Sequence, residues 1–164
     1  MNEFESTPTG PRTPDDVSRN LRVLVVDDEP LICQLNTDIL AGAGYQVDVA
    51  GDGVAAWDAL QRNDYDLIVT DNQMPKLSGV DLVTKIRTAG MVLPVIMATG
   101  TLPEAEFTGR HWLYPFTLLL KPYSLAELLG TVKAVLHGTG DHGAAMILVP
   151  NWECQPQVFG LRLA

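Results

Sequence analysis

The stretch DLIVTDNQMPKLSG at residues 66–79 decides the fold. Residues 66–70 form a short apolar run rich in β-branched side chains, which is typical of a strand covered on both faces. Asp71 follows this run, and the next loop contains Pro75 and Gly79, residue types that interrupt regular structure. Apolar residues at helical spacing then continue until Gly90. The stretch therefore predicts a strand, an acidic loop and a helix.

The same order of strand, loop and helix recurs on both sides of this stretch. Further strands are predicted at residues 21–26 (LRVLVV), 45–50 (YQVDVA), 93–99 (LPVIMAT) and 116–121 (FTLLLK). Apolar stripes predict helices after most of them; their members are Leu31, Ile32, Leu35, Ile39 and Leu40, then Val54, Trp57, Ala59 and Leu60. Such alternation predicts an α/β fold with a parallel sheet, right-handed crossovers and helices on both faces.

The helix boundaries carry recognisable signals. Pro30 suits a first helical turn, where its missing N–H costs nothing. Ser124 and Glu127 form a capping box for the last helix, which Gly138 ends. By contrast, Pro103, Gly109 and Pro115 interrupt residues 101–116, so the helix expected there is predicted to be short or irregular.

Composition divides the chain into three parts. Residues 1–20 are rich in proline and polar side chains and predict a flexible N-terminal arm. Residues 21–138 form the predicted domain, and residues 139–164 form a C-terminal tail of unknown role. Within the tail, MILV at residues 146–149 has the character of an edge strand.

Charge and cysteine content exclude several function classes. The formal net charge is -9 and the basic residues are scattered singly, which argues against direct nucleic-acid binding. No segment has the apolar length needed to cross a bilayer, and the N-terminus does not resemble a signal peptide. Cys33 and Cys154 lack the spacing of a zinc site or disulfide scaffold, and Cys33 is interpreted as a small core residue. A cytoplasmic protein is expected.

Polar side chains follow four of the predicted strands. Asp27 and Asp28 follow the first, Asp71 the third, Thr99 ends the fourth and Lys121 ends the fifth. Because ligands of parallel α/β sheets bind at the carboxyl ends of the strands, these side chains are expected to converge. An isolated strand-end Asp is more often a helix cap, so the prediction rests on the combination.

The combination predicts a metal-assisted phosphoryl site. Three crowded carboxylates need a cation, and a set of oxygen ligands without His or Cys favours Mg²⁺ or Mn²⁺. Lys121 and Thr99 are suited to stabilising a phosphoryl group, and Asp71 is the central nucleophile candidate. A phosphohydrolase would want a carboxylate two residues after Asp71, where Gln73 stands.

In the motifs VLVVDDEP, LIVTDNQMPKLSG, VIMATG and LLLKPYS, the sequence resembles the receiver domain of two-component response regulators, from about Arg22 to His137. The resemblance implies a flavodoxin-like three-layer α/β/α fold with a five-stranded parallel sheet in the order 2-1-3-4-5. It implies phosphorylation of Asp71 by a histidine kinase, with Mg²⁺ held by Asp28, Asp71 and the main-chain carbonyl of Gln73. Asp27 would act through metal-bound water.

The resemblance also implies how the signal leaves the site. Thr99 and Lys121 would couple phosphorylation to the surface of the fourth and fifth strands, which usually meets the partner. Leu118 stands where the family commonly has an aromatic residue that reports activation. Of Tyr114 and Phe116, only Phe116 shares the predicted strand face of Leu118.

The expected function is a signalling switch and not a turnover enzyme. The expected partners are a sensor histidine kinase or phosphotransfer protein and a downstream protein, and a homodimer is compatible with the sequence. The roughly 26 residues after the last helix are too few for an output domain, which favours a single-domain switch. A phosphate reservoir or relay intermediate, and a receiver module of a larger hybrid kinase, remain alternatives.

Overall fold

The computed structural model describes residues 21–100, 116–138 and 145–148. The described strands are β1 (Arg22–Val26), β2 (Gln46–Ala50), β3 (Leu67–Asp71), β4 (Val95–Thr99), β5 (Phe116–Leu120) and β6 (Ala145–Leu148). The described helices are α2 (Pro30–Gly42), α3 (Gly53–Arg62), α4 (Gly79–Thr88) and α6 (Leu125–His137). The predicted N-terminal arm, the irregular region before β5, Tyr114 and most of the C-terminal tail lie outside the described residues.

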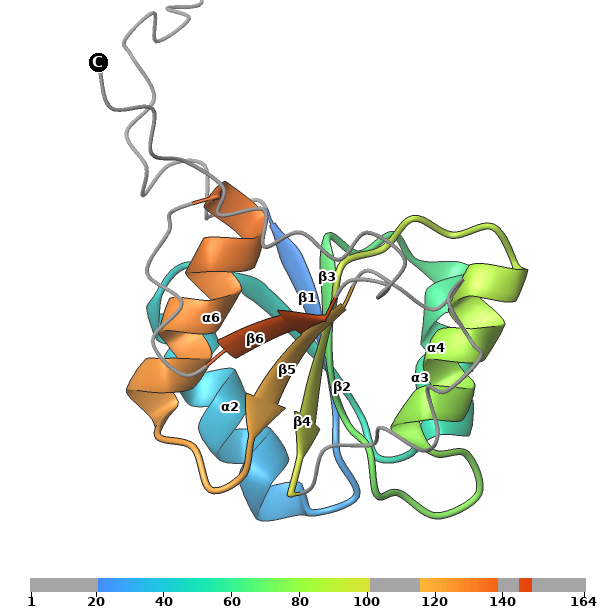
Figure 1. The fold of residues 1–164 in the computed structure, drawn as a ribbon, viewed down its shortest axis with the longest axis horizontal. Coiled ribbons are helices and arrows are strands. Elements are labelled where there is room, and N and C mark those ends of the chain that lie inside the picture. The colour runs from blue at the N-terminus through green and yellow to red at the C-terminus, as the bar shows by residue number, and fades with distance from the viewer. Residues whose placement is uncertain (1–20, 101–115, 139–144, 149–164) are drawn as a thin grey trace, which may run out of the picture.

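The strands form one sheet in the order β2-β1-β3-β4-β5-β6. β1 to β5 pair in parallel, which confirms the predicted flavodoxin-like order 2-1-3-4-5. β6 extends this sheet by pairing antiparallel with β5, at the segment for which an edge strand was predicted. Figure 1 shows α2 and α6 on one side of the sheet and α3 and α4 on the other, the predicted three layers.

Alternating strand side chains supply a separate core on each face of the sheet. On the α3 and α4 face, Leu24, Ile68 and Leu118 are fully buried. On the α2 and α6 face, Leu67 and Leu119 are fully buried. Burying each such side chain contributes roughly 1.5–3 kcal/mol, so both faces hold the strand ends in place. Leu118 and Phe116 lie in the same core, as strand parity predicted.

The predicted apolar stripes of α2 and α3 are only partly buried. In α3, Val54 is 45% exposed. Leu31 and Leu35 are 69% and 40% exposed, whereas the buried residues of α2 are Cys33, Asn36 and Leu40. The apolar residues of α2 spread over two neighbouring faces of the helix, and packing against α6 determines which of these faces is buried. The interpretation of Cys33 as a small core residue is confirmed, since it is 6% exposed.

The predicted helix signals are present. Pro30 lies in the first turn of α2, and Ser124 and Glu127 form the complete capping box of α6. Gly138 ends α6 with a φ of 65°, a conformation that glycine adopts without a steric cost. No helix in the described part of the chain is long and apolar enough to cross a membrane.

Candidate functional site

The carboxyl ends of β1 and β3 bring three acidic side chains together. Asp27 and Asp28 follow β1, and Asp71 is the last residue of β3. Ligand oxygens from the three carboxylates all lie within 4.8 Å of one another. Asp27 and Asp71 are 3% and 8% exposed, whereas Asp28 is exposed. The cluster could hold a metal ion with an open side toward solvent.

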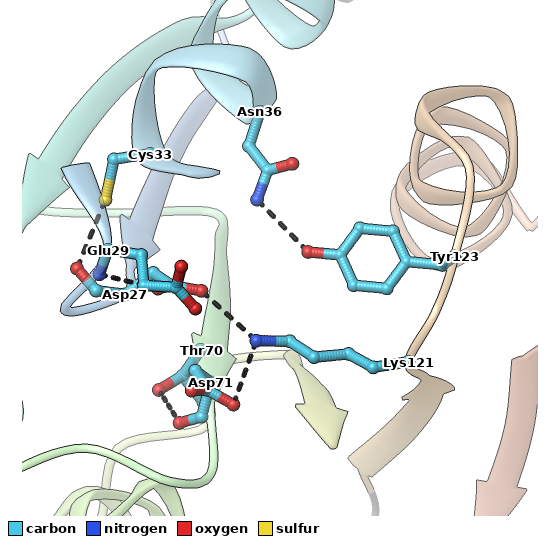
Figure 2. Close-up of polar contacts among 8 residues, drawn as sticks. All are labelled: Asp27, Glu29, Cys33, Asn36, Thr70, Asp71, Lys121 and Tyr123. Atoms are coloured by element: carbon cyan, nitrogen blue, oxygen red, sulfur yellow. Dashed lines mark hydrogen bonds and ion pairs between the residues drawn. The ribbon is translucent and has the colours of Figure 1, made fainter. Parts of the chain in front are cut away.

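Lys121 lies between two of these carboxylates. Its Nζ is 3.3 Å from Asp71 Oδ1 and 3.5 Å from Asp27 Oδ2. Figure 2 shows both contacts as dashed lines. Burial by itself would lower the pKa of Lys121, but the charges of Asp71 and Asp27 outweigh it and raise the pKa. The lysine therefore stays charged at neutral pH.

Asp27 is held in a fixed orientation. Its Oδ1 accepts a hydrogen bond from the main-chain N–H of Glu29 at 2.9 Å, and its main-chain oxygen accepts from Cys33 Sγ at 3.2 Å. Burial raises the pKa of Asp27, although the Glu29 N–H and Lys121 oppose this effect. Burial also raises the pKa of the Cys33 thiol, which therefore acts here as a packed donor and not as a reactive thiolate.

The remaining predicted site residues lie around this cluster. Thr99 is the last residue of β4 and is 1% exposed. Its main-chain oxygen accepts a hydrogen bond from the N–H of Lys121 at 2.9 Å, which joins the ends of β4 and β5. Gln73 lies in the loop after β3 with an exposed side chain. The structure thus brings Lys121 into contact with both Asp27 and Asp71 and places Thr99 at the neighbouring end of β4.

A tight turn after β3, which the sequence analysis did not identify, fixes Asp71. Asn72 is 7% exposed; its Oδ1 accepts from Val80 N–H at 3.2 Å and its main-chain oxygen from Gly79 N–H at 3.0 Å. A Cβ on Gly79 would lie 2.4 Å from the main-chain oxygen of Asp71. The turn therefore requires glycine at this position because the backbone comes too close for a side chain.

The same loop is attached to the β2–α3 connection. Lys76, which has a φ of 68°, forms an ion pair with Asp52. The hydrogen bond from Lys76 lowers the pKa of Asp52, which also caps α3 by accepting from Ala55 N–H at 2.8 Å. A Cβ on Gly53 would lie 2.6 Å from the main-chain oxygen of Leu77. These contacts hold the loop between β3 and α4 against the connection between β2 and α3.

A groove of about 660 Å³ opens beside the cluster, between α2 and the β5–α6 connection. Its lining residues are Glu29, Ile32, Leu35, Asn36, Lys121, Pro122, Tyr123, Ser124 and Leu125. Two of these lining residues are in contact, since Asn36 Nδ2 donates to the Tyr123 hydroxyl at 3.3 Å (Figure 2). The groove is mostly apolar, and Lys121 connects it with the acidic cluster.

Comparison with known proteins identifies the class that this fold and site define. The sequence model of the response regulator receiver domain matches residues 23–133. The chain therefore belongs to the response regulator receiver family, a family of signalling domains.

Two curated relatives illustrate the relationship. The chain is 32% identical over 130 residues to the probable transcriptional regulatory protein TcrX of Mycobacterium tuberculosis, a match that covers 77% of this chain and 56% of TcrX. It is 34% identical over 135 residues to the transcriptional regulatory protein CusR of Escherichia coli, covering 81% of this chain and 57% of CusR. The chain thus spans about half the length of these curated relatives.

Solved structures agree with this assignment. The chemotaxis response regulator CheY4 of Vibrio cholerae is 34% identical with a TM-score of 0.64, covering 71% of this chain and 98% of CheY4. The response regulator TrrA of Thermotoga maritima, in complex with Mg²⁺ and BeF, is 31% identical with a TM-score of 0.62. That match covers 71% of this chain and 99% of TrrA.

Proposed function

We propose that Asp71 accepts a phosphoryl group from a phosphohistidine of a sensor kinase or phosphotransfer protein, and that this modification changes a protein-binding surface. The observation that carries the proposal is the position of Lys121, whose ammonium lies within 3.5 Å of two of three clustered carboxylates. A fixed cation beside a carboxylate nucleophile is suited to phosphoryl transfer. The complex of the relative TrrA with Mg²⁺ and BeF supports the same chemistry.

The proposed phosphoryl transfer needs no reactant besides Asp71 and the phosphohistidine of the donor. A carboxylate oxygen of Asp71 attacks the phosphorus while the phosphorus–nitrogen bond to the donor breaks. The bonding electron pair leaves with the imidazole nitrogen, and a proton on the ring makes the departing histidine neutral. An acyl phosphate remains on Asp71. Lys121 balances charge on the transferred oxygens, and its raised pKa keeps it protonated throughout.

The carboxylate cluster fits a hard divalent cation such as Mg²⁺ or Mn²⁺. Asp28, Asp71 and the main-chain carbonyl of Gln73 would hold the ion, and Asp27 would act through a metal-bound water. The bound ion would neutralise charge that accumulates on the phosphoryl oxygens. Asp27, buried and oriented by Glu29 N–H, would orient that water.

The groove between α2 and the β5–α6 connection supports docking of the donor protein. It opens next to Lys121, so a helix seated there would bring its histidine side chain close to Asp71. Leu125, which lines the groove, is 37% exposed, and Leu31 of the neighbouring helix α2 is 69% exposed. We propose that an amphipathic helix of the histidine-bearing donor binds in this groove.

Incubation with acetyl phosphate and Mg²⁺ tests the proposed function. Intact-mass measurement should show the gain of one phosphoryl group by the wild-type chain and no gain by Asp71→Ala. A wild-type chain that never gains this mass would contradict the proposal. Transfer back from Asp71 to the donor histidine would favour the alternative of a relay intermediate or phosphate reservoir.

Asp28→Asn is expected to weaken Mg²⁺ binding by at least about tenfold. Even the loss of a residue that only hydrogen-bonds to a metal ligand typically lowers metal affinity by about that factor. Titration calorimetry with MgCl₂ measures the change. Asp58→Asn is the matched control, since Asp58 is exposed on α3 and the same charge is removed. Equal Mg²⁺ affinity in both variants would remove Asp28 from the metal site.

Stabilisation by Mg²⁺ should grow as the pH rises from about 4 to about 7. Burial raises the pKa of Asp27 above its ordinary value of 3.8, so its protonated form favours the metal-free fold. The stability that protonated Asp27 gives to the metal-free fold is complete below the pKa of Asp27 in the unfolded chain. This stability is lost as the pH rises through the raised pKa of Asp27 in the folded protein. Thermal unfolding with and without MgCl₂ measures the effect. A constant Mg²⁺ effect across this range would contradict the assignment.

Thr99→Ala should leave phosphoryl uptake within about tenfold of wild type, because one neutral hydrogen bond contributes about 0.5–1.5 kcal/mol. The response of β4 and β5 to phosphorylation should weaken, since Thr99 is assigned to coupling. Hydrogen exchange of the two strands, with Thr99→Ser as the control that keeps the hydroxyl, measures this response. Complete loss of phosphorylation would show that Thr99 belongs to the chemistry.

A further inference from the structure

β6 covers the outer edge of β5 and so occupies a position that a partner strand could take. Backbone pairing runs from Phe116 opposite Leu148 to Leu119 opposite Ala145. The opposite edge of β5 pairs with β4. The main-chain groups along this part of β5 are therefore engaged on both sides, and the β5 edge is closed to any other strand while β6 is in place.

The covered strand is directly connected to the candidate phosphoryl site. Lys121 follows β5, and its N–H donates to Thr99 at the end of β4. Its Nζ contacts Asp71. The first β6 residue, Ala145, pairs with Leu119, only two positions before Lys121. Any shift of Lys121 toward a phosphoryl group on Asp71 therefore acts on the part of β5 where the β6 pairing begins.

The two ladders of β5 differ in how firmly they are anchored. β4 is buried at every position and lies inside the sheet. β6 is an edge strand of four residues, joined to the rest of the sheet through β5 alone. A displacement of β5 will therefore preserve its register with β4 and disturb its register with β6, because the short edge ladder is the weaker one.

Leu118 favours a signal that travels from Lys121 along the β5 backbone to β6. It is fully buried, and its backbone is in register with Met97 of β4 and with Met146 of β6. No aromatic ring stands at this position to change rotamer between the core and the surface. Because Lys121 directly follows β5, a change at Lys121 can reach the sheet edge through the β5 backbone.

We propose that β6 is an intramolecular regulatory strand, which closes the β5 edge in the unphosphorylated protein and is released when Asp71 is phosphorylated. The proposal rests on the proposed function of Asp71. The freed β5 edge would accept an extended segment of a partner protein by strand addition. Because coupling between two sites is reciprocal, detaching β6 should also favour the phosphorylated state.

Hydrogen exchange of the full chain with Mg²⁺ and beryllofluoride, a phosphoryl mimic, tests the proposal without any mutation. Exchange at residues 145–148 should become about tenfold faster when beryllofluoride binds, within the usual range of coupling between sites. Exchange that stays constant or slows there, while beryllofluoride binds, would overturn this inference alone. Failure of the wild-type chain to bind beryllofluoride would instead contradict the proposed function of Asp71.

Two neighbouring proline variants provide the reciprocal test. In an antiparallel ladder, adjacent residues alternate between pairing their N–H with the partner strand and turning it outward. Met146→Pro and Ile147→Pro should therefore have different effects. Only one of them removes a main-chain N–H that bonds to β5, whereas the other removes an outward N–H, which an edge strand tolerates. The variant that loses the bond should bind beryllofluoride about tenfold more tightly than its neighbour. Equal affinities in both variants and the wild type would overturn the proposal.

Discussion

Lys121→Met is expected to slow phosphoryl uptake from acetyl phosphate by about 10²–10³-fold, the cost of removing one preorganised charge-stabilising donor. Methionine keeps most of the apolar stem but loses the ammonium that lies 3.3 Å from Asp71. Intact-mass time courses in MgCl₂ measure the rate. The metal would still attract the phosphoryl group, so slow uptake should remain where Asp71→Ala shows none.

The same substitution should also change how the site responds to metal. Without Lys121, the buried carboxylates of Asp27 and Asp71 lose their shared counter-ion, so Mg²⁺ should stabilise the variant more than the wild type. Lys133→Met is the control, because Lys133 is exposed on α6. Uptake by Lys121→Met at the wild-type rate would show that Lys121 is a structural ion pair only.

Gly79→Ala is expected to cost about 3 kcal/mol of folding stability, the upper end of what forced overpacking usually costs. The added Cβ would lie 2.4 Å from the main-chain oxygen of Asp71 and 2.9 Å from Asn72 Cα. Both are backbone atoms, so no rotamer change relieves the contact. The backbone of Asp71 must move, and a misplacement of about 1 Å can slow a reaction by about 10²-fold.

Urea unfolding and acetyl phosphate uptake together measure the effect of Gly79→Ala. Gly130→Ala is the matched control, since nothing lies within 4 Å of a Cβ at that position of α6. Alanine there should stabilise the helix by roughly 0.5–1 kcal/mol. Wild-type stability and uptake in Gly79→Ala would contradict the close approach of this turn to Asp71.

Two features could be predicted from the sequence: the parallel sheet, and the gathering of polar side chains at one edge of it. Both follow from the repeated order of buried strand, loop and helix. Buried runs such as LIVT define strands, and the carboxyl ends of parallel strands must lie together. Asp27, Asp71 and Lys121 follow three such strands, so their position at one edge of the sheet is predictable without coordinates. For β6, its apolar character suggested only an edge strand, and its antiparallel direction and its register could not be predicted because both depend on the chain path.

Contacts made between loops were not predictable in the same way. The turn that encloses Asn72 and Gly79 depends on a backbone approach that leaves no periodic signal. The ion pair between Lys76 and Asp52 joins two loops that the linear sequence separates by an entire helix and strand. The exposure of Leu31 likewise depended on which face of α2 meets α6.

The proposed function depends on which side chain carries the phosphoryl group. The chain should be phosphorylated with acetyl phosphate and Mg²⁺, reduced with borohydride, which converts an acyl phosphate of aspartate to homoserine, and mapped by peptide mass spectrometry. We expect homoserine at position 71 and unchanged aspartate at positions 27 and 28. Homoserine at position 27 or 28, or none at position 71, would contradict the proposed function.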